Sequence, residues 1–282
     1  MVTLRRLKKQ SDRGAFFMTN VFAVASGKGG TGKTVTVVNI GTSLALLGKR
    51  TIILDADIGM ANLGLVLGLE RSRVTLHEVL AGEADVSEAI YEMPTGLRVV
   101  PSGISLKGFQ GADPDRLQFV MRELIKDADY VIIDAPAGIN KDGVIPLAVA
   151  DEVILVVNPE LASMLDAAKV EAVIDIVGGR LGGIIINRVP PYSSAAIVQR
   201  IGEVMKAPIL GVVPEDSFVR TSTAFKAPVV VRYPDSPASM GFKAIAARIA
   251  GLGIPSDPGS ASPGHSREGF VERLARSVFG DT

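Results

Sequence analysis

The stretch from Gly27 to Thr34, Gly-Lys-Gly-Gly-Thr-Gly-Lys-Thr, constrains the fold most, because it matches the pattern G-x-x-x-x-G-K-[S/T]. An apolar run before it predicts a strand, and the residues after it have the pattern of a helix. Glycines let the backbone approach a polyphosphate, and the positive end of the helix faces the same anion. We expect Lys33 to reach the β and γ phosphates and the Thr34 hydroxyl to bind Mg²⁺. The predicted nucleotide-binding residues here are Gly29, Gly30, Thr31, Gly32, Lys33, Thr34 and Thr36.

The composition narrows the possible classes of protein. Of the 282 residues, 47% are hydrophobic but only 5% are aromatic, which suits parallel strands buried on both faces. The formal net charge is zero, so no overall electrostatic attraction to nucleic acid is expected. Because cysteine is absent, disulfides, thiolate metal sites and cysteine catalysis are excluded. No uninterrupted apolar run reaches about 18 residues, so we expect no transmembrane helix.

Strand and helix signals alternate along most of the chain, which predicts an α/β fold with a doubly wound, mostly parallel sheet flanked by helices. Ligands bind such sheets at the carboxyl ends of the strands. A helix is predicted from Asp113 to Lys126. The predicted strands cover residues 21–25, 51–54, 97–100, 130–134, 153–157, 183–187 and 209–213.

Four segments are expected from the composition along the chain. Residues 1–18 form a basic arm that we expect to be disordered, although a membrane or nucleic-acid contact is an alternative. Residues 19–254 form the P-loop domain. Residues 255–266 are rich in Pro, Gly and Ser and predict a flexible linker, and residues 267–282 predict an amphipathic helix.

Acidic residues follow two of the predicted strands. Asp55 and Asp57 stand at the end of one strand, and Asp134 ends another. Beside a phosphate loop, one such carboxylate can orient an attacking water while others hold Mg²⁺. We therefore predict Thr34, Asp55 and Asp134 as the metal site, while one carboxylate of the pair Asp55 and Asp57 orients the water.

Several motifs together resemble the MinD/ParA family of ATPases. Lys28 to Thr34 is similar to the family's deviant Walker A motif, which has an extra lysine early in the loop. Asp55 to Gly64 and Asp134 to Gly138 resemble the two switch regions of MinD. The resemblance runs from about residue 21 to residue 252, and it also includes Asn158 to Glu160 and Gly211 to Asp216.

The resemblance implies an ATP-dependent homodimer with two nucleotides at its interface. Lys28 is then catalytic in trans: it reaches the partner's phosphates in the manner of an arginine finger. Lys33 and Asp57 complete the catalytic set that the resemblance implies, with Asp57 as the residue that positions the water. Asn187 and the loop Pro214, Glu215 and Asp216 are implied to hold the adenine. The guanine signature Asn-Lys-x-Asp is missing because Arg188 follows Asn187, which favours ATP.

The C-terminal segment has the spacing of an amphipathic helix. One face carries apolar residues, and the opposite face carries Glu272, Arg273, Arg276 and Ser277. It resembles the membrane-targeting helix of MinD, which implies a protein that lies peripherally on the inner face of the cell membrane and binds anionic lipid. Packing on its own domain or on a partner protein is the alternative. The predicted membrane-binding residues are Phe270, Val271, Leu274, Val278 and Phe279.

The leading hypothesis is an ATPase that positions division or motility proteins through an unidentified activator or cargo protein. A ParA-like DNA-partition ATPase and a flagellar-number regulator are alternatives, and the neutral charge counts against specific nucleic-acid binding. A small-molecule kinase would not need Lys28, so this lysine argues against that class of protein. The iron–sulfur proteins of the superfamily need cysteine ligands, so the absence of cysteine excludes them. His77 is expected on a helix surface, and Met60 is expected in core or interface packing.

Overall fold

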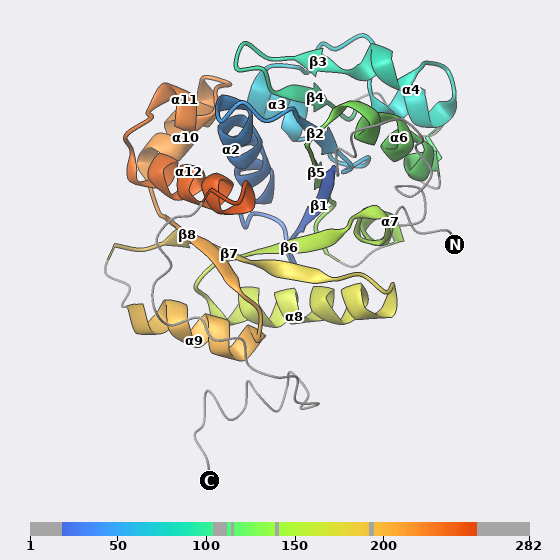
Figure 1. Ribbon diagram of the computed structural model, residues 1–282. Coiled ribbons are helices and arrows are strands. Elements are labelled where there is room, and N and C mark those ends of the chain that lie inside the picture. Colours follow the sequence, from blue (N-terminus) through green and yellow to red (C-terminus); the bar gives the residue numbers. More distant parts are fainter. Residues whose placement is uncertain (1–18, 104–111, 114–115, 139–140, 192–194, 253–282) are drawn as a thin grey trace.

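The computed structural model describes residues 19–103, 112–113, 116–138, 141–191 and 195–252. One eight-stranded sheet runs through this part, in the order β3-β4-β2-β5-β1-β6-β7-β8 (Figure 1). Every neighbouring pair is parallel except β3 and β4, which confirms the predicted doubly wound sheet. The strands are β1 (Asn20–Ala25), β2 (Thr51–Asp55), β3 (Tyr91–Glu92), β4 (Arg98–Val100), β5 (Tyr130–Asp134), β6 (Glu152–Val157), β7 (Leu181–Val189) and β8 (Ile209–Pro214).

Helices cover both faces of the sheet (Figure 1). One face is covered by α2 (Lys33–Leu46), α3 (Leu63–Leu67), α10 (Ser217–Ala224), α11 (Val229–Arg232) and α12 (Pro237–Ile249). The other is covered by α4 (Leu76–Ala81), the 3-10 turn η1 (Val86–Ala89), α6 (Leu117–Leu124) with the turn η3 (Ile125–Asp127), α7 (Lys141–Val149), α8 (Leu161–Ile176) and α9 (Ala195–Met205).

Alternating strand residues divide the core into two hydrophobic layers. In β2, for example, Ile52 and Leu54 belong to the layer under α4, α6 and α8, whereas Ile53 belongs to the layer under α2 and α12. This alternation follows from the two-residue period of a strand, and burial on both faces explains why the strands are continuously apolar.

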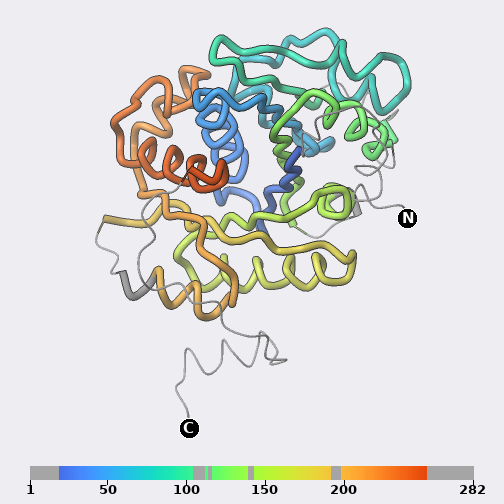
Figure 2. The backbone as a smooth tube through the Cα atoms, viewed as in Figure 1, coloured from blue at the N-terminus to red at the C-terminus, as the bar shows by residue number. Residues whose placement is uncertain are grey.

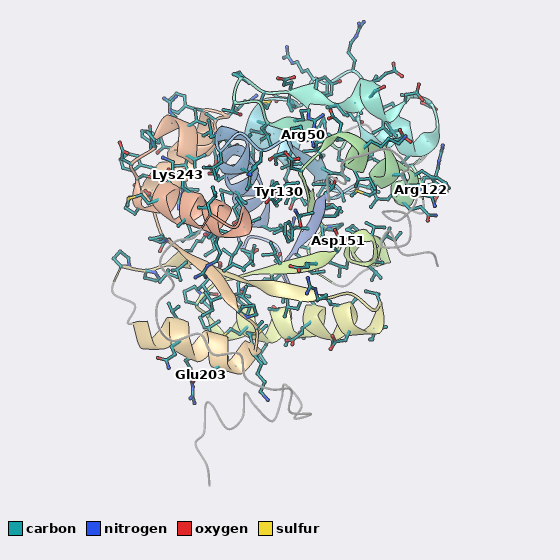
Figure 3. The ribbon with its side chains drawn as sticks, in the orientation of Figure 1. Arg50, Arg122, Tyr130, Asp151, Glu203 and Lys243 are labelled. Atoms are coloured by element: carbon teal, nitrogen blue, oxygen red, sulfur yellow. The ribbon has the colours of Figure 1, made fainter. Side chains whose placement is uncertain are left out.

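The second layer joins segments that are far apart in the sequence. Helices α2 and α12 lie side by side, as the blue and red tubes in Figure 2 show. The Tyr130 hydroxyl, at the start of β5, lies 3.4 Å from the carbonyl oxygen of Ile249 at the end of α12 (Figure 3). Helix α12, the last helix that the structure describes, therefore packs against α2, the helix that follows the phosphate loop.

The register of the central strands brings the predicted site residues to one edge. Asp134 at the end of β5 is paired with Asp55 of β2 on one side and with Val24 of β1 on the other. The loop after β1 therefore begins beside both carboxylates, at the carboxyl edge of the parallel sheet.

Two local predictions differ from the structure. The short strand β3 was not predicted, because two residues on a sheet edge carry no readable period. His77 was predicted on a helix surface, but it is only 1% exposed, because the start of α4 faces the loop after β2. In the part of the chain that the structure describes, no helix is both long and apolar enough to cross a membrane.

Candidate nucleotide-binding site

Two glycines fix the path of the loop between β1 and α2. Gly32 has φ of 88°, in the left-handed region that favours glycine, and a Cβ there would lie 2.3 Å from Asn187 Nδ2. A Cβ on Gly27 would lie 2.2 Å from the backbone of Asp166 in α8. Asn187 Nδ2 also donates a 2.8 Å hydrogen bond to the Thr31 carbonyl, so that β7 holds the loop from the side.

The charged residues of the loop meet the end of β5. Lys33 Nζ forms an ion pair with Asp134 Oδ1, and the two side chains are only 7% and 1% exposed. The Thr34 hydroxyl donates a 2.6 Å hydrogen bond to the other oxygen, Asp134 Oδ2. We call Lys33, Thr34, Asp55 and Asp134 the phosphate end of the site. All four were predicted from the sequence, and the structure brings them together.

Asp55 is fully buried at this end. Its Oδ1 accepts from the Asp57 backbone N–H at 3.1 Å, and its Oδ2 accepts from the Leu63 N–H at 3.2 Å. Burial raises the pKa of Asp55 well above its usual value of 3.8, and the neighbouring Asp134 carboxylate raises it further. Two acidic groups side by side in the interior thus provide a place where a bound cation is favourable.

The donor set fits Mg²⁺ bound together with a phosphate. Hydroxyl and carboxylate oxygens are the ligands that Mg²⁺ prefers, and it usually takes one or two carboxylates plus phosphate and water. Among the residues that the structure describes, no group of three or more His, Cys, Asp or Glu side chains is placed to hold a metal alone.

Asp57 lies on the loop between β2 and α3, outside this buried cluster. Its Oδ1 accepts a 3.0 Å hydrogen bond from the Met60 N–H, which turns the loop back on itself. Met60 is 70% exposed, so it does not pack in the core of the single chain.

Two threonines in and after the loop are buried. The Thr36 hydroxyl donates to the Gly32 carbonyl at 2.9 Å, which ties the first turn of α2 to the loop. The Thr31 hydroxyl has no hydrogen-bond partner within the described part of the chain. A buried polar group of this kind fits a site that binds a ligand.

Lys28 is placed differently from Lys33. Its side chain is 36% exposed, and its Nζ lies 3.4 Å from Glu160 Oε2, in an ion pair whose glutamate is 62% exposed. The Ser26 hydroxyl fixes the backbone by donating to the Lys28 carbonyl at 3.0 Å. The Lys28 ammonium therefore lies on the surface and not on the carboxylates of its own phosphate end.

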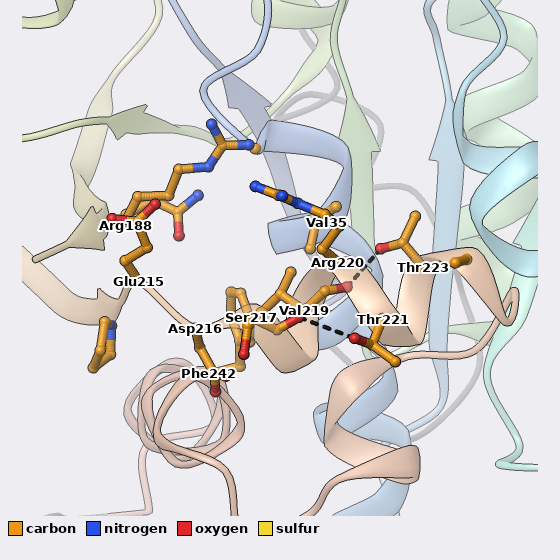
Figure 4. Close-up of a pocket in the computed structure, with 14 residues that line it drawn as sticks. Val35, Arg188, Glu215, Asp216, Ser217, Val219, Arg220, Thr221, Thr223 and Phe242 are labelled. Atoms are coloured by element: carbon orange, nitrogen blue, oxygen red, sulfur yellow. Dashed lines mark hydrogen bonds between the residues drawn. The ribbon is translucent and has the colours of Figure 1, made fainter.

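A cavity of about 890 Å³ opens on the other side of Gly32. Figure 4 shows Arg188 and Glu215 at one side and the α10 residues Arg220 and Thr223 at the other. We call this the base cavity. Its lining comprises Gly32, Val35, Asn187, Arg188, Pro214, Glu215, Asp216, Ser217, Val219, Arg220, Thr221, Thr223, Ala224 and Phe242.

The predicted adenine residues all line the base cavity, but Asp216 also has a structural role. Its carboxylate caps α10 through the Phe218 N–H at 2.9 Å and reaches α12 through the Ala238 N–H at 3.1 Å. Arg188, which sequence reasoning used only to exclude a guanine motif, lines the cavity with a φ of 56°. A non-glycine residue in this region is strained, and such residues cluster at functional sites.

The α10 and α12 residues of the cavity were not predicted. Val35, Arg220, Thr223 and Phe242 come from three helices and form no local motif. The predicted membrane-binding residues Phe270, Val271, Leu274, Val278 and Phe279 lie outside the described residues, as do the N-terminal arm and the linker.

A glycine-rich loop that opens a helix, with buried carboxylates at the ends of two adjacent strands, defines a P-loop nucleotide-binding protein. A profile of the CobQ/CobB/MinD/ParA nucleotide-binding domain matches residues 22–229. The chain therefore belongs to this family.

Relatives within the family agree with this assignment. An uncharacterized ATP-binding protein of Methanocaldococcus jannaschii is 43% identical over 263 residues, which cover 93% of this chain and 98% of the relative. The cell division ATPase MinD of Pyrococcus furiosus is 35% identical, with a TM-score of 0.78 and coverage of 84% of this chain and 100% of that one. The septum site-determining protein MinD of Pyrococcus horikoshii, solved with Mg-ADP, is 34% identical, with a TM-score of 0.78 and coverage of 83% and 97%.

Proposed function

We propose that this chain is a MinD-type ATPase that binds ATP and Mg²⁺, dimerises, and hydrolyses ATP to ADP and phosphate. In this proposal it associates with the inner face of the cell membrane and positions division or motility proteins. The observation that carries the proposal is that two lysines of one loop have different surroundings. Lys33 is buried on Asp134, whereas Lys28 is about one-third exposed and pairs with the exposed Glu160.

The phosphate end binds the nucleotide within one chain. Lys33 exchanges Asp134 for the β and γ phosphates, and the loop N–H groups and the start of α2 face the same charge. Thr34, Asp55 and Asp134 hold Mg²⁺, which supplies positive charge to the phosphate oxygens when it is bound. Relief of the repulsion between the two buried carboxylates favours this binding.

Hydrolysis requires an oriented water and a second positive charge. Asp57 orients the water by accepting a hydrogen bond from it, because its carboxylate lies only two residues after Asp55 of the phosphate end. Lys28 of the partner subunit neutralises the charge that develops in the transition state. Release of Lys28 from Glu160 costs little, since exposed ion pairs contribute about 0–1 kcal/mol. Turnover is thereby coupled to dimerisation.

A mixing experiment tests the trans role of Lys28. Lys28→Ala and Asp57→Asn variants are each expected to bind ATP but to release almost no phosphate. In a mixed dimer, one site has an intact Asp57 and receives an intact Lys28 from the partner. An equal mixture should therefore recover about one quarter of the wild-type rate, given random pairing of two-fold dimers. No recovery on mixing would contradict action in trans.

The predicted amphipathic helix provides the proposed membrane attachment. A single such helix binds lipid weakly, but a dimer presents two, and avidity gains of roughly 10²–10⁴ are accessible. We expect the full chain to sediment with anionic liposomes in ATP more than in ADP. Phe270→Glu should abolish this, whereas Ser277→Glu adds the same charge on the polar face and should retain most of it. Equal effects of both substitutions would contradict the helix-face assignment.

The neutral net charge counts against a DNA partner, and the predicted amphipathic helix supports a membrane partner for this proposal. A salt-dependent DNA-binding assay with the full chain distinguishes the two. Tight, salt-sensitive DNA binding without liposome binding would replace the membrane switch by a DNA-partition ATPase.

A further inference from the structure

His77 is a buried polar residue that the proposed function does not use. It is the second residue of α4, and its Nε2 lies 3.0 Å from the Ile58 carbonyl oxygen. A carbonyl can only accept, so Nε2 carries the proton and donates. The Ser102 hydroxyl lies 3.3 Å from the same nitrogen. This hydrogen bond connects α4 to the loop that carries Asp57.

The imidazole ring is held by its surroundings. The Leu76 N–H donates to the Pro101 carbonyl at 2.9 Å, which docks the start of α4 on the segment after β4. A Cβ on Gly103 would lie only 2.5 Å from His77 Nδ1, so this glycine packs directly against the ring. The His77 backbone N–H also donates to the Thr75 hydroxyl at 3.3 Å. The ring is therefore a rigid point from which to hold another segment.

The loop after β2 is also held by the burial of the Ile58 side chain in the hydrophobic core and by contacts at the phosphate end. The Ala56 N–H donates to the Asp134 carbonyl at 3.0 Å, and the Asp57 and Leu63 N–H groups donate to Asp55. Between these anchors, Gly59 and Met60 are exposed. The Ile58 carbonyl lies on the residue directly after Asp57, so a hydrogen bond there restricts the direction of the chain that carries the Asp57 carboxylate.

We propose that His77 is a positioning residue for Asp57: the donor at Nε2 fixes the Ile58 carbonyl and so holds the Asp57 carboxylate where it orients water. This inference rests on the proposed role of Asp57 in ATP hydrolysis. His77 does not lie on the phosphate end, so its loss should lower kcat and leave the KM for ATP nearly unchanged. Misplacement of an orienting group by about 1 Å can lower the rate about 100-fold.

Two substitutions at the same position separate the donor from packing. His77→Leu keeps similar volume without a donor, and we expect its kcat to fall about tenfold with less than about a twofold change in KM. His77→Gln carries an amide N–H at similar reach and should recover most of the lost kcat. Ser102→Ala, which leaves the bond to Ile58 in place, is the matched control and should stay near wild type. If the leucine variant does not fold, His77→Asn replaces it, because its amide is too short to reach the carbonyl.

Backbone hydrogen exchange provides a readout that does not depend on turnover. In the nucleotide-free full chain, His77→Leu should speed exchange at residues 57–62, and His77→Gln should restore protection. If the wild type releases no phosphate from ATP, the proposed function fails, and the exchange rates still decide whether His77 holds the loop. Unchanged exchange in the leucine variant, or an unchanged kcat in an active background, would overturn the positioning role.

Discussion

The phosphate end and the base cavity share Gly32 and Asn187 as their boundary, yet they are built in different ways. At the phosphate end, the buried polar groups already have partners within the chain: Lys33 pairs with Asp134, and Asp55 accepts two backbone N–H groups. The base cavity is an open space of about 890 Å³ lined by residues from several helices and strands. The difference indicates that the phosphate end exchanges existing contacts for the ligand, whereas the cavity only adds contacts.

The largest effect is therefore expected at Lys33. Lys33→Ala removes the charge-assisted bonds to the phosphates, at about 1.5–3 kcal/mol each, and leaves two buried carboxylates without their cation. We expect at least a hundredfold loss of ATP affinity, measured by titration calorimetry. Lys28→Ala is the control, and it should change affinity little. Equal losses in both variants would erase the distinction between the two lysines.

The boundary itself is tested by glycine substitutions in the same loop. Gly32→Ala places a Cβ against Asn187 at a φ of 88°, so we expect a loss of about 1–3 kcal/mol in the free energy of unfolding in urea. A Cβ on Gly29 would have nothing within 4 Å, and Gly29→Ala should cost less than about 1 kcal/mol. A stable Gly32→Ala protein would mean that Asn187 does not close the loop.

The pH dependence of stability tests the burial of charge at the phosphate end. Because the pKa of Asp55 is raised, its contribution to the free energy of unfolding is fully present below the unfolded-state pKa near 3.8. That contribution is lost as pH rises through the folded-state pKa. Each unit of pKa corresponds to about 1.4 kcal/mol. Without Mg²⁺ and nucleotide, Asp55→Asn should therefore gain stability relative to wild type as pH rises.

A second carboxylate with the opposite shift is the control for that measurement. Arg50 lowers the pKa of Asp129 through a side-chain hydrogen bond, so the stability from Asp129 is present above its usual pKa of 3.8 and is lost as pH falls through the folded-state pKa. Asp129→Asn should lack part of the loss of stability that the wild type shows at acidic pH. It should leave the pH dependence that comes from Asp55 unchanged. The same pH profile for both variants would contradict the role of burial at Asp55.

The smallest effect is expected in the base cavity. Arg220 lines it from α10, and Arg220→Ala should raise the KM for ATP about two- to fivefold with kcat unchanged, because the lost contacts stabilise the ground state and the transition state equally. Arg232→Ala removes an arginine that stacks on Phe225 outside the cavity lining and should leave the KM unchanged. A fall in kcat for Arg220→Ala would move part of the chemistry into the cavity.

The difference between the phosphate end and the base cavity also explains which site residues could be predicted from the sequence. The phosphate end was predicted residue by residue, because Lys33 and Thr34 belong to a local glycine-rich motif, and Asp55 and Asp134 end strands that apolar runs reveal. Cavity residues such as Thr223 and Phe242 were missed, since the packing of α10 and α12 brings them together and no spacing along the chain does. His77 was misplaced because one polar residue in a six-residue helix carries no signal of which side faces a neighbouring loop.

Steady-state phosphate release by the full chain, measured in Mg-ATP over a range of protein concentrations, tests the central claim most directly. The account predicts that the rate per chain rises with concentration and then levels off, because each phosphate end needs Lys28 of a second chain. A rate per chain that does not depend on concentration, or no phosphate release at any concentration, would contradict it.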